Sequence, residues 1–276
     1  MIGVTGATGF IGTQLMTKLG SEGIAIDLRN QNCDDIANLL KNRRCNTIIH
    51  LANPPPSNDV NEQDRIKQES SDLAEKLIQI ADLIENVNFI VLSSIRVYPN
   101  GIDSFTINSE IGPIDGYGQG KVEMEKKFVN SKYNSVILRC SSVQGVGLDG
   151  SPRGLIGAFA QQSANRLLKI MGEGGAIKDC LHIDDLVNLL LCLLEIIPIN
   201  ENVILPVGGG SPRCVLDIAK IVMEKTESEI VHVEPAQFEL SGWVDNNDLK
   251  LIVDWEPVWA IDEMIDESLD AVRGAT

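Results

Sequence analysis

The fold of this chain is decided near its N-terminus by the stretch Thr5-Gly6-Ala7-Thr8-Gly9-Phe10-Ile11-Gly12. It follows a short apolar run and opens a segment, residues 10–19, whose apolar residues have helical spacing. In such a strand-turn-helix setting, Gly6 permits a tight turn, Gly9 lets the backbone approach a pyrophosphate, and Gly12 lets the helix pack close to the sheet. The helix N-terminus then holds the anion. We therefore expect a dinucleotide site that also includes Thr8, Phe10 and Ile11.

A second motif, Tyr-x-x-x-Lys at Tyr117 and Lys121, indicates redox chemistry with that dinucleotide. The two residues are four apart, so they share one face of a helix. A nearby ammonium lowers the pKa of a phenol, which makes Tyr117 a usable acid and base near neutral pH. Ser94, at the end of a predicted strand, can hydrogen-bond the same substrate oxygen.

Composition excludes several other classes of function. Of the 276 residues, 23 are basic and 39 acidic, which gives a formal net charge of −16 and argues against nucleic acid or an anionic membrane surface as a partner. No stretch reaches the roughly 20 apolar residues of a membrane span, and no signal peptide precedes the first predicted strand, so we expect a cytoplasmic protein. The six cysteines form no C-x-x-C pair, so we expect reduced thiols and no metal site.

Strand-like and helix-like segments alternate through the first half of the chain, a pattern typical of a doubly wound parallel sheet. The predicted strands are residues 24–28, 47–51, 89–93 and 135–139, and the predicted helices are 34–41, 66–85 and 117–132. After residue 139 the pattern is less regular. We predict a dinucleotide-binding domain of residues 1–145, to which 176–207 return, and a small substrate-binding lobe of residues 146–175 and 208–276.

Further motifs follow in order along the chain: Ile48-Ile49-His50-Leu51-Ala52, Ser93-Ser94-Ile95-Arg96-Val97-Tyr98, Tyr117-Gly118-Gln119-Gly120-Lys121, Ile137-Leu138-Arg139, Lys178-Asp179-Cys180-Leu181-His182-Ile183-Asp184-Asp185 and Val207-Gly208-Gly209-Gly210. Their order and spacing resemble the extended short-chain dehydrogenase/reductases, the NAD-dependent epimerase/dehydratase family that acts on nucleotide sugars. The resemblance implies an α/β Rossmann-type doubly wound parallel sheet with a small C-terminal substrate lobe, and a homodimer.

The resemblance also implies roles for individual residues. Ser94, Tyr117 and Lys121 match the family's catalytic set, in which the lysine also holds the nicotinamide ribose. Leu51 and Ala52 match the strand end that contacts the cofactor. His50 and His182 lie in a buried strand and in a structural segment, so we interpret both as core or turn residues.

Two departures from the family narrow the reaction. Ile95 and Arg96 stand where the 4,6-dehydratases carry an Asp-Glu pair, so elimination is disfavoured. Arg96 also replaces the cysteine of the epimerising reductases that make GDP-fucose, which disfavours 3,5-epimerisation. Hydride transfer at a carbinol carbon remains.

Two activities fit that chemistry. Two segments are similar to the corresponding segments of the dTDP-4-dehydrorhamnose reductases: the compact residues 24–29 and Arg139-Cys140-Ser141-Ser142-Val143. This similarity favours reduction of a 4-ketosugar. Phe10-Ile11-Gly12 and His182-Ile183-Asp184-Asp185 are similar to the epimerases, so a nucleotide-sugar C4 epimerase with tightly held NAD stays open. An NADP-binding sensor or scaffold protein without turnover is the alternative of another class, although such members usually lack the Tyr or the Lys.

The choice between NAD and NADP stays open in the sequence. Asp27 is the kind of residue that binds a ribose hydroxyl, which favours NAD. In the shortened loop, however, Asp27 and Leu28 can lie beside the adenine, with Arg29 meeting a 2′-phosphate.

The net charge of −16 repels a sugar nucleotide at long range, so its phosphates must be held by cations concentrated at one cleft. We expect these cations to be Arg139, Arg153, Lys178 and Arg213. Ser142 replaces the asparagine that grips the sugar nucleotide in the family's epimerases. Arg96 is two residues after Ser94, a spacing that returns to the same face of a strand, so we expect it to enter the substrate pocket.

Overall fold

The computed structural model describes residues 1–84, 86–199 and 201–274. Residues 85, 200, 275 and 276, which fall within the predicted helix 66–85 and the predicted domains, lie outside the described part. The contacts divide the chain into two compact units. Unit 1 consists of Met1–Pro99, Glu110–Arg139 and Leu190–Leu205, and unit 2 consists of Asn100–Ser109, Cys140–Leu189 and Pro206–Thr276.

A six-stranded sheet forms the centre of unit 1, with the order β12-β6-β4-β3-β1-β2. The strands are β1 (Ile2–Thr5), β2 (Gly23–Ile26), β3 (Thr47–His50), β4 (Asn88–Ser94), β6 (Ser135–Cys140) and β12 (Val203–Val207). The pairs β1–β2, β1–β3 and β3–β4 are parallel. All residues of β3 and β6 are buried, which explains their nearly continuous apolar sequences. The predicted Rossmann-type sheet is confirmed.

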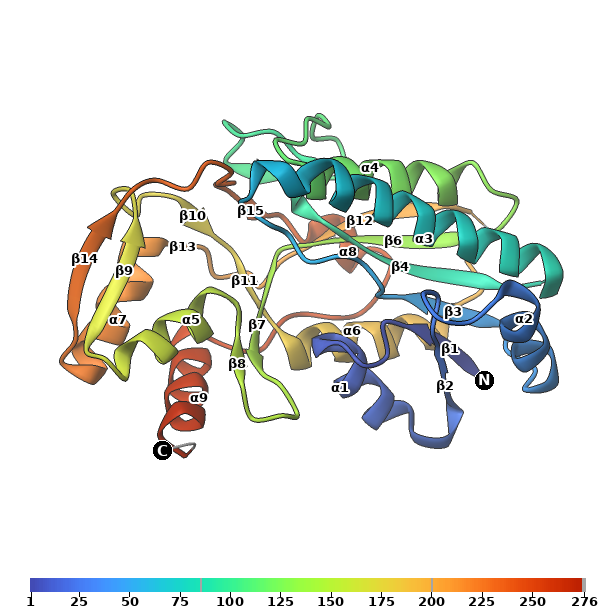
Figure 1. The fold of residues 1–276 in the computed structure, drawn as a ribbon, viewed down its shortest axis with the longest axis horizontal. Coiled ribbons are helices and arrows are strands. Elements are labelled where there is room, and N and C mark those ends of the chain that lie inside the picture. The colour runs from blue at the N-terminus through green and yellow to red at the C-terminus, as the bar shows by residue number, and fades with distance from the viewer. Residues whose placement is uncertain (85, 200, 275–276) are drawn as a thin grey trace. The chain divides into compact units, whose positions relative to one another are not determined.

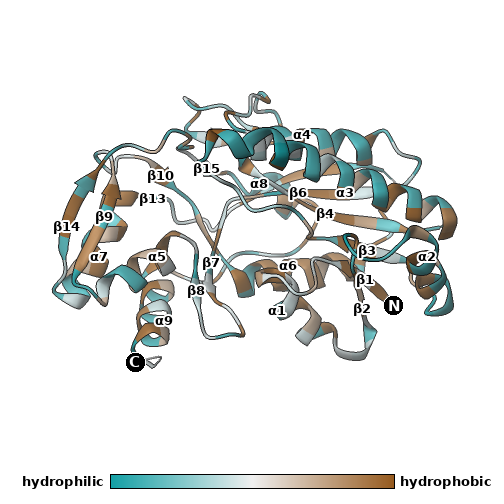
Figure 2. Cartoon of the chain, viewed as in Figure 1, coloured by the Kyte–Doolittle hydropathy of each residue, from teal (hydrophilic) through white to brown (hydrophobic). Residues whose placement is uncertain are grey.

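Helices cover both faces of this sheet (Figure 1). Helices α3 (Gln63–Ile84) and α4 (Gly116–Val129) lie together on one face, and α1 (Phe10–Leu19) lies on the other. Helix α2 (Cys33–Asn42) packs against α3, and the short 3-10 turns are η1 (Gly20–Glu22), η2 (Val60–Glu62) and η3 (Ile95–Val97). Leu73, Leu77 and Ile80 of α3 are buried in one hydrophobic cluster with apolar residues of the strands. Figure 2 shows both hydrophilic and hydrophobic stretches on α3 and α4, as expected for helices with one face in the core.

The segment between β1 and β3 is as compact as the sequence indicated. Only one strand, β2, lies outside β1 in the sheet. From β2 the chain passes through residues 27–32 directly into α2, whose start is capped by the side chain of Asn32, which accepts a hydrogen bond from the Asp35 N–H. The motif Ile48-Ile49-His50-Leu51-Ala52 therefore contains most of β3, the third strand along the chain, and the two residues after it.

Unit 2 is built from short ladders and helices. Strand β7 (Ser142–Val146) pairs in parallel with β11 (Cys180–His182) and antiparallel with β8 (Pro152–Arg153), and β9 (Leu167–Met171) pairs in parallel with β14 (Glu229–Val233). Two smaller ladders join β10 (Ile177–Lys178) to β13 (Arg213–Cys214) and β5 (Ser104–Phe105) to β15 (Trp243–Val244). The helices are α5 (Gly154–Ser163), α7 (Val215–Thr226), α8 (Asn247–Lys250) and α9 (Ile261–Gly274), with α6 (Ile183–Ile196) shared between the units. Apolar side chains of α5, α7, α9 and β9 form the core of unit 2.

The boundaries of the two units differ from the predicted domain limits at four places. Residues 100–109, 140–145, 176–189 and 206–207 were expected with the dinucleotide-binding domain, but their contacts group them with unit 2. The parallel pairings of β7 with β11 and of β5 with β15 join segments that are far apart in the sequence and explain most of this difference. Which unit binds cofactor and which binds substrate stays a prediction. No described helix is both long and apolar enough to cross a membrane.

Candidate active site

The glycine-rich stretch forms a tight turn between β1 and α1. Gly6 has a φ of 67°, a left-handed conformation that favours glycine, and its carbonyl accepts a hydrogen bond of 2.9 Å from the Gly9 N–H. A Cβ on Gly12 would collide with that same carbonyl oxygen. Among the described residues, no side chain caps the start of α1. The N–H groups of its first turn therefore suit a pyrophosphate, as predicted for a dinucleotide site.

The ends of β1 and β3 meet beside this turn. The hydroxyl of Thr5 accepts hydrogen bonds of 3.1 Å from the N–H groups of Leu51 and of Ala52, and lies 2.8 Å from Nδ1 of His50. Burial, with a smaller effect from Lys121, lowers the pKa of His50 to about 3. His50 is thus a neutral core residue, in line with its interpretation from sequence. It helps to hold Leu51 and Ala52 next to Gly6.

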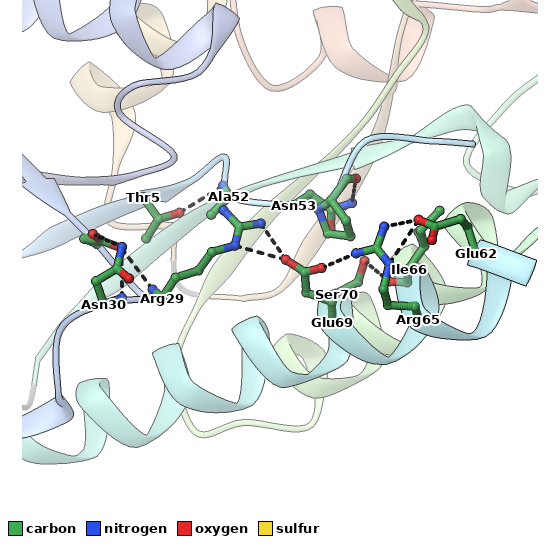
Figure 3. A network of polar contacts seen from close by, with 12 residues as sticks. Thr5, Arg29, Asn30, Ala52, Asn53, Glu62, Arg65, Ile66, Glu69 and Ser70 are labelled. Carbon is green, nitrogen blue, oxygen red and sulfur yellow. Dashed lines mark hydrogen bonds and ion pairs between the residues drawn. The ribbon is translucent and has the colours of Figure 1, made fainter. Parts of the chain in front are cut away.

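Asp27 and Arg29, the residues expected to distinguish NAD from NADP, both have partners within unit 1. The Asp27 carboxylate accepts hydrogen bonds from the N–H groups of Arg29 and Asn30 and from the Asn30 side chain, which lowers the pKa of Asp27. The Arg29 guanidinium donates two hydrogen bonds, of 3.0 and 2.7 Å, to Glu69 of α3. Glu69 also pairs with Arg65, as Figure 3 shows. The side chain of Leu28 is buried in the core.

The catalytic residues predicted from sequence lie at the end of β4 and the start of α4. Ser94 is the last residue of β4, and its hydroxyl accepts a 3.2 Å hydrogen bond from the Arg96 N–H. Lys121 is buried, and its ammonium donates a 2.6 Å hydrogen bond to the carbonyl of Leu92 in the same strand. Its Nζ is 5.7 Å from the ring centroid of Tyr117. The structure therefore brings Lys121 to Tyr117, as the i, i+4 spacing predicts.

Close packing fixes the first turns of α4. A Cβ on Gly116 would collide with the backbone carbonyl of Gln63 in α3, and one on Gly118 would collide with the carbonyl of Arg96 in η3. The Gly116 N–H also donates a 2.8 Å hydrogen bond to the Gln63 side chain. The small residues on either side of Tyr117 thus allow its helix to lie against two other elements.

Arg96 lies in η3 and not on β4, so the expected strand alternation does not apply to it. Its guanidinium carbon is nevertheless 5.9 Å from the ring centroid of Tyr117. The guanidinium is ion-paired with Asp115, whose side chain is fully buried. Asp115 also caps α4 by accepting a 2.7 Å hydrogen bond from the Gly118 N–H. Sequence reasoning missed Asp115, although an aspartate directly before a helix is a typical N-cap signal.

Arg139 does not hold a phosphate, contrary to expectation. Its side chain is 7% exposed, and it donates hydrogen bonds to both carboxylate oxygens of Glu125 and to the hydroxyl of Tyr98. Glu125 also accepts a hydrogen bond from the hydroxyl of Ser93. A buried guanidinium needs such a complete set of partners, so this arginine is part of the core of unit 1.

Unit 2 contains the remaining predicted substrate residues. Lys178 and Arg213 occupy opposite positions of the β10–β13 ladder. The Lys178 ammonium is 2.7 Å from the carbonyl of Leu240 and 3.2 Å from Glu239, whereas the Arg213 guanidinium donates to the carbonyl of Pro212. The structure thus brings two of the expected cations together.

Arg153 and Ser142 lie in a different sheet of unit 2, which consists of β11, β7 and β8. Arg153 is half exposed and pairs with Asp149 at 2.6 Å. Ser142 is exposed on β7, and its hydroxyl accepts a 2.7 Å hydrogen bond from Gln144. Arg153 and Ser142 are thus not in the ladder that holds Lys178 and Arg213.

The segment after Lys178 is structural. The buried carboxylate of Asp179 accepts hydrogen bonds from the N–H groups of Gly209 and Val244. His182 stacks on Trp259 with ring centroids 3.7 Å apart and contacts Glu267. Burial raises the pKa of the Cys180 thiol to about 12, so this cysteine is neither a nucleophile nor a ready metal ligand. His182 is a core residue, as interpreted from sequence.

A cavity of about 400 Å³ opens elsewhere in unit 2, lined in part by Gly210, Trp243 and Trp259. The cofactor-binding, catalytic and substrate-binding residues predicted from sequence do not line this cavity.

Comparisons with known proteins agree with this fold and family. The curated ADP-L-glycero-D-manno-heptose-6-epimerase of Brachyspira hyodysenteriae is 24% identical over 266 residues, covering 83% of this chain and 82% of the relative. The structure of MoeE5 in complex with UDP-glucuronic acid and NAD has a TM-score of 0.87 at 19% identity, covering 100% of this chain and 99% of the other. UDP-glucose 4-epimerase from Thermotoga maritima, solved with UDP-glucose, has a TM-score of 0.86 at 21% identity, covering 99% of both chains.

The family itself is shown by a match that covers most of the chain. Residues 2–204 match the family described as the NAD dependent epimerase/dehydratase family. This range contains the glycine-rich turn, the end of β4 and the start of α4. The chain is therefore an enzyme of the NAD-dependent epimerase/dehydratase family, as its motifs indicated.

Proposed function

We propose that this protein catalyses hydride transfer at a carbinol carbon of a nucleotide-activated sugar, in the direction of 4-ketosugar reduction. The observation that carries the proposal is the juxtaposition of Tyr117 with Lys121, near the end of β4 where Ser94 lies. When bound, the nicotinamide supplies or accepts the hydride. The residues of the chain orient the sugar and move its proton.

The chemistry of the proposed step follows from these side chains. In reduction, the Tyr117 hydroxyl donates a proton to the sugar oxygen as the carbonyl becomes an alcohol. The Ser94 hydroxyl donates a hydrogen bond to the same oxygen. The Lys121 ammonium, held by the Leu92 carbonyl, stabilises the phenolate that Tyr117 becomes. Ile95 and Arg96 provide no carboxyl group for elimination, which supports simple hydride transfer over dehydration.

The proposed cofactor site lies at the glycine-rich turn and the adjacent strand ends. It comprises Gly6, Thr8, Gly9, Phe10, Ile11, Gly12, Asp27, Leu28, Arg29, Leu51, Ala52 and Lys121. Either NAD or NADP fits this proposal. Asp27 already accepts three hydrogen bonds and Arg29 is paired with Glu69, so neither nucleotide meets an unoccupied partner at the end of β2.

For the substrate, we propose that Lys178 and Arg213 hold phosphate, with Ser142 and Arg153 as further contacts. Two cations at opposite positions of a ladder repel each other, and an anion between them would remove that repulsion. Net charge −16 makes such a local concentration of cations necessary. We further propose that two copies of the chain associate, which light scattering of the purified protein would test.

The second candidate is C4 epimerisation with tightly held NAD. It is supported by the comparisons, since a UDP-glucose 4-epimerase and a UDP-glucuronic acid 4-epimerase are among the matched structures. The two activities differ in cofactor balance: a reductase consumes one reduced cofactor for each sugar, whereas an epimerase regenerates its own.

The experiment begins with mass spectrometry of any dinucleotide and sugar nucleotide that co-purify with the protein. The protein is then incubated with a panel of 4-keto and 4-hydroxy sugar nucleotides, with and without added NADH or NADPH. Stoichiometric loss of reduced cofactor with a 4-ketosugar supports reduction. Conversion of a 4-hydroxy sugar without added cofactor supports epimerisation. Bound dinucleotide without turnover of any sugar would favour the sensor or scaffold alternative.

A further inference from the structure

Two cations lie close to the ring of Tyr117, and only one of them belongs to the predicted catalytic set. Lys121 Nζ is 5.7 Å and the guanidinium carbon of Arg96 is 5.9 Å from the ring centroid. Arg96 carries its own counter-ion, because its guanidinium is ion-paired with the fully buried carboxylate of Asp115. A charged pair thus lies beside the residue proposed to move the proton.

The same pair joins the two elements that carry the reacting side chains. Arg96 lies in η3, two residues after Ser94, and its N–H donates a hydrogen bond to the Ser94 hydroxyl. Asp115 caps α4 through the Gly118 N–H, one residue after Tyr117. The carbonyl of Arg96 also lies so close to Gly118 that a Cβ there would not fit. An ion pair between Arg96 and Asp115 therefore connects the end of β4 to the start of α4 at the reacting residues.

This arrangement assigns Arg96 a different task from gripping an anion. Its side chain is only 23% exposed, and its charge is already compensated by Asp115. We infer that Arg96 and Asp115 are positioning residues of the proposed reaction. Their ion pair holds Ser94 and Tyr117 at a fixed position relative to each other and sets the electrostatic potential at the Tyr117 hydroxyl. The inference rests on the proposed function for its consequence in catalysis and on the geometry for its effect on Tyr117.

The sign of each effect follows from the charges around Tyr117. On its own helix the facing charge is Lys121, at the helix start Asp115, and in η3 Arg96. From α3, the neutral Gln63 packs against Gly116 and Lys67 packs near Gly120. A cation favours the phenolate and an anion disfavours it. In the intact protein, Arg96 and Asp115 largely cancel, so removal of either charge exposes the other.

The test is an absorbance titration of tyrosinate in the full chain, which has only three tyrosines. Tyr98 is fully buried, and burial together with Asp82 raises the pKa of Tyr133, so Tyr117→Phe identifies the Tyr117 signal. Arg96→Gln keeps an N–H donor for Asp115, and Asp115→Asn keeps the oxygen that caps the helix. We expect the apparent pKa of Tyr117 to rise by about 0.5–1 unit in Arg96→Gln and to fall by about as much in Asp115→Asn.

The double variant Arg96→Gln/Asp115→Asn should return the titration close to that of the unaltered protein, and Arg96→Lys should keep it there. Equal midpoints in all variants, or shifts of the same sign in both single variants, would overturn the inference. If Arg96→Gln does not fold, as judged by circular dichroism, Asp115→Asn decides the question by itself, since only a downward shift supports it.

Steady-state kinetics, with whichever sugar nucleotide of the panel is turned over, add a second readout. A positioning role predicts that Arg96→Gln lowers kcat at nearly constant KM. A rise in KM at constant kcat would show instead that Arg96 binds an anionic group of the substrate, and would overturn the inference. The titration needs neither sugar nor cofactor. Shifts of the expected signs in a protein that turns over no nucleotide sugar would support the electrostatic part and count against the proposed function instead.

Discussion

The predicted catalytic residues of unit 1 and the predicted phosphate-binding residues of unit 2 are held in opposite ways. Lys121 is buried and bonded to a strand carbonyl, and Tyr117 lies on a helix whose start is fixed by close backbone packing. Arg153 and Arg213, in contrast, are exposed side chains, paired with a surface carboxylate or a neighbouring carbonyl. A proton transfer requires fixed atoms, whereas phosphate recognition tolerates side chains that rearrange on binding.

The largest expected effect on activity is at the rigidly held catalytic residue Tyr117. Tyr117→Phe removes only the hydroxyl that donates the proton, so we expect hydride transfer to fall by about 100- to 10,000-fold. Dinucleotide affinity, measured by calorimetry, should stay nearly unchanged. Lys121→Ala should reduce both turnover and dinucleotide affinity. Equal turnover in Tyr117→Phe and the unaltered protein would remove Tyr117 from the catalytic set.

The second prediction compares a buried with an exposed arginine. Arg139→Met leaves the buried Glu125 carboxylate without its ion-pair partner, so the free energy of unfolding should fall by about 3–5 kcal/mol. Arg153→Met breaks a half-exposed pair with Asp149 and should cost about 0–1 kcal/mol. Urea unfolding of both variants measures the difference. Similar losses of unfolding free energy in the two variants would mean that burial does not make the Arg139–Glu125 pair more important for stability than the Arg153–Asp149 pair.

The smallest expected effect concerns the cations of unit 2. Replacing Lys178 and Arg213 together by Met should weaken binding of the sugar nucleotide about tenfold, roughly 1.4 kcal/mol, because two partly screened charges are lost. Dinucleotide affinity and kcat should not change. Lys220→Met, which breaks an exposed ion pair with Asp217 on α7, serves as the matched control for a general change in surface charge. Unaltered sugar-nucleotide affinity in the double variant would mean that other residues of the chain bind the phosphates.

Local sequence determined the parts of the site that depend on short spacings. Gly6, Gly9 and Gly12 predict the turn and the helix start because the backbone geometry there requires glycine. Tyr117 and Lys121 predict a shared helical face because their spacing matches one turn. Alternating strands and helices, together with buried apolar runs, predict the parallel sheet.

Tertiary structure alone decided which charges meet. Arg139 is in a strand and Glu125 in a helix, and only their burial side by side shows that this arginine is a core residue. Arg96 and Asp115 are far enough apart in sequence that neither predicts the other, and Lys178 meets Arg213 only through the pairing of β10 with β13. Spacing along the chain determines local geometry because bonded residues have few conformations, whereas the partner of a long charged side chain depends on how distant elements pack.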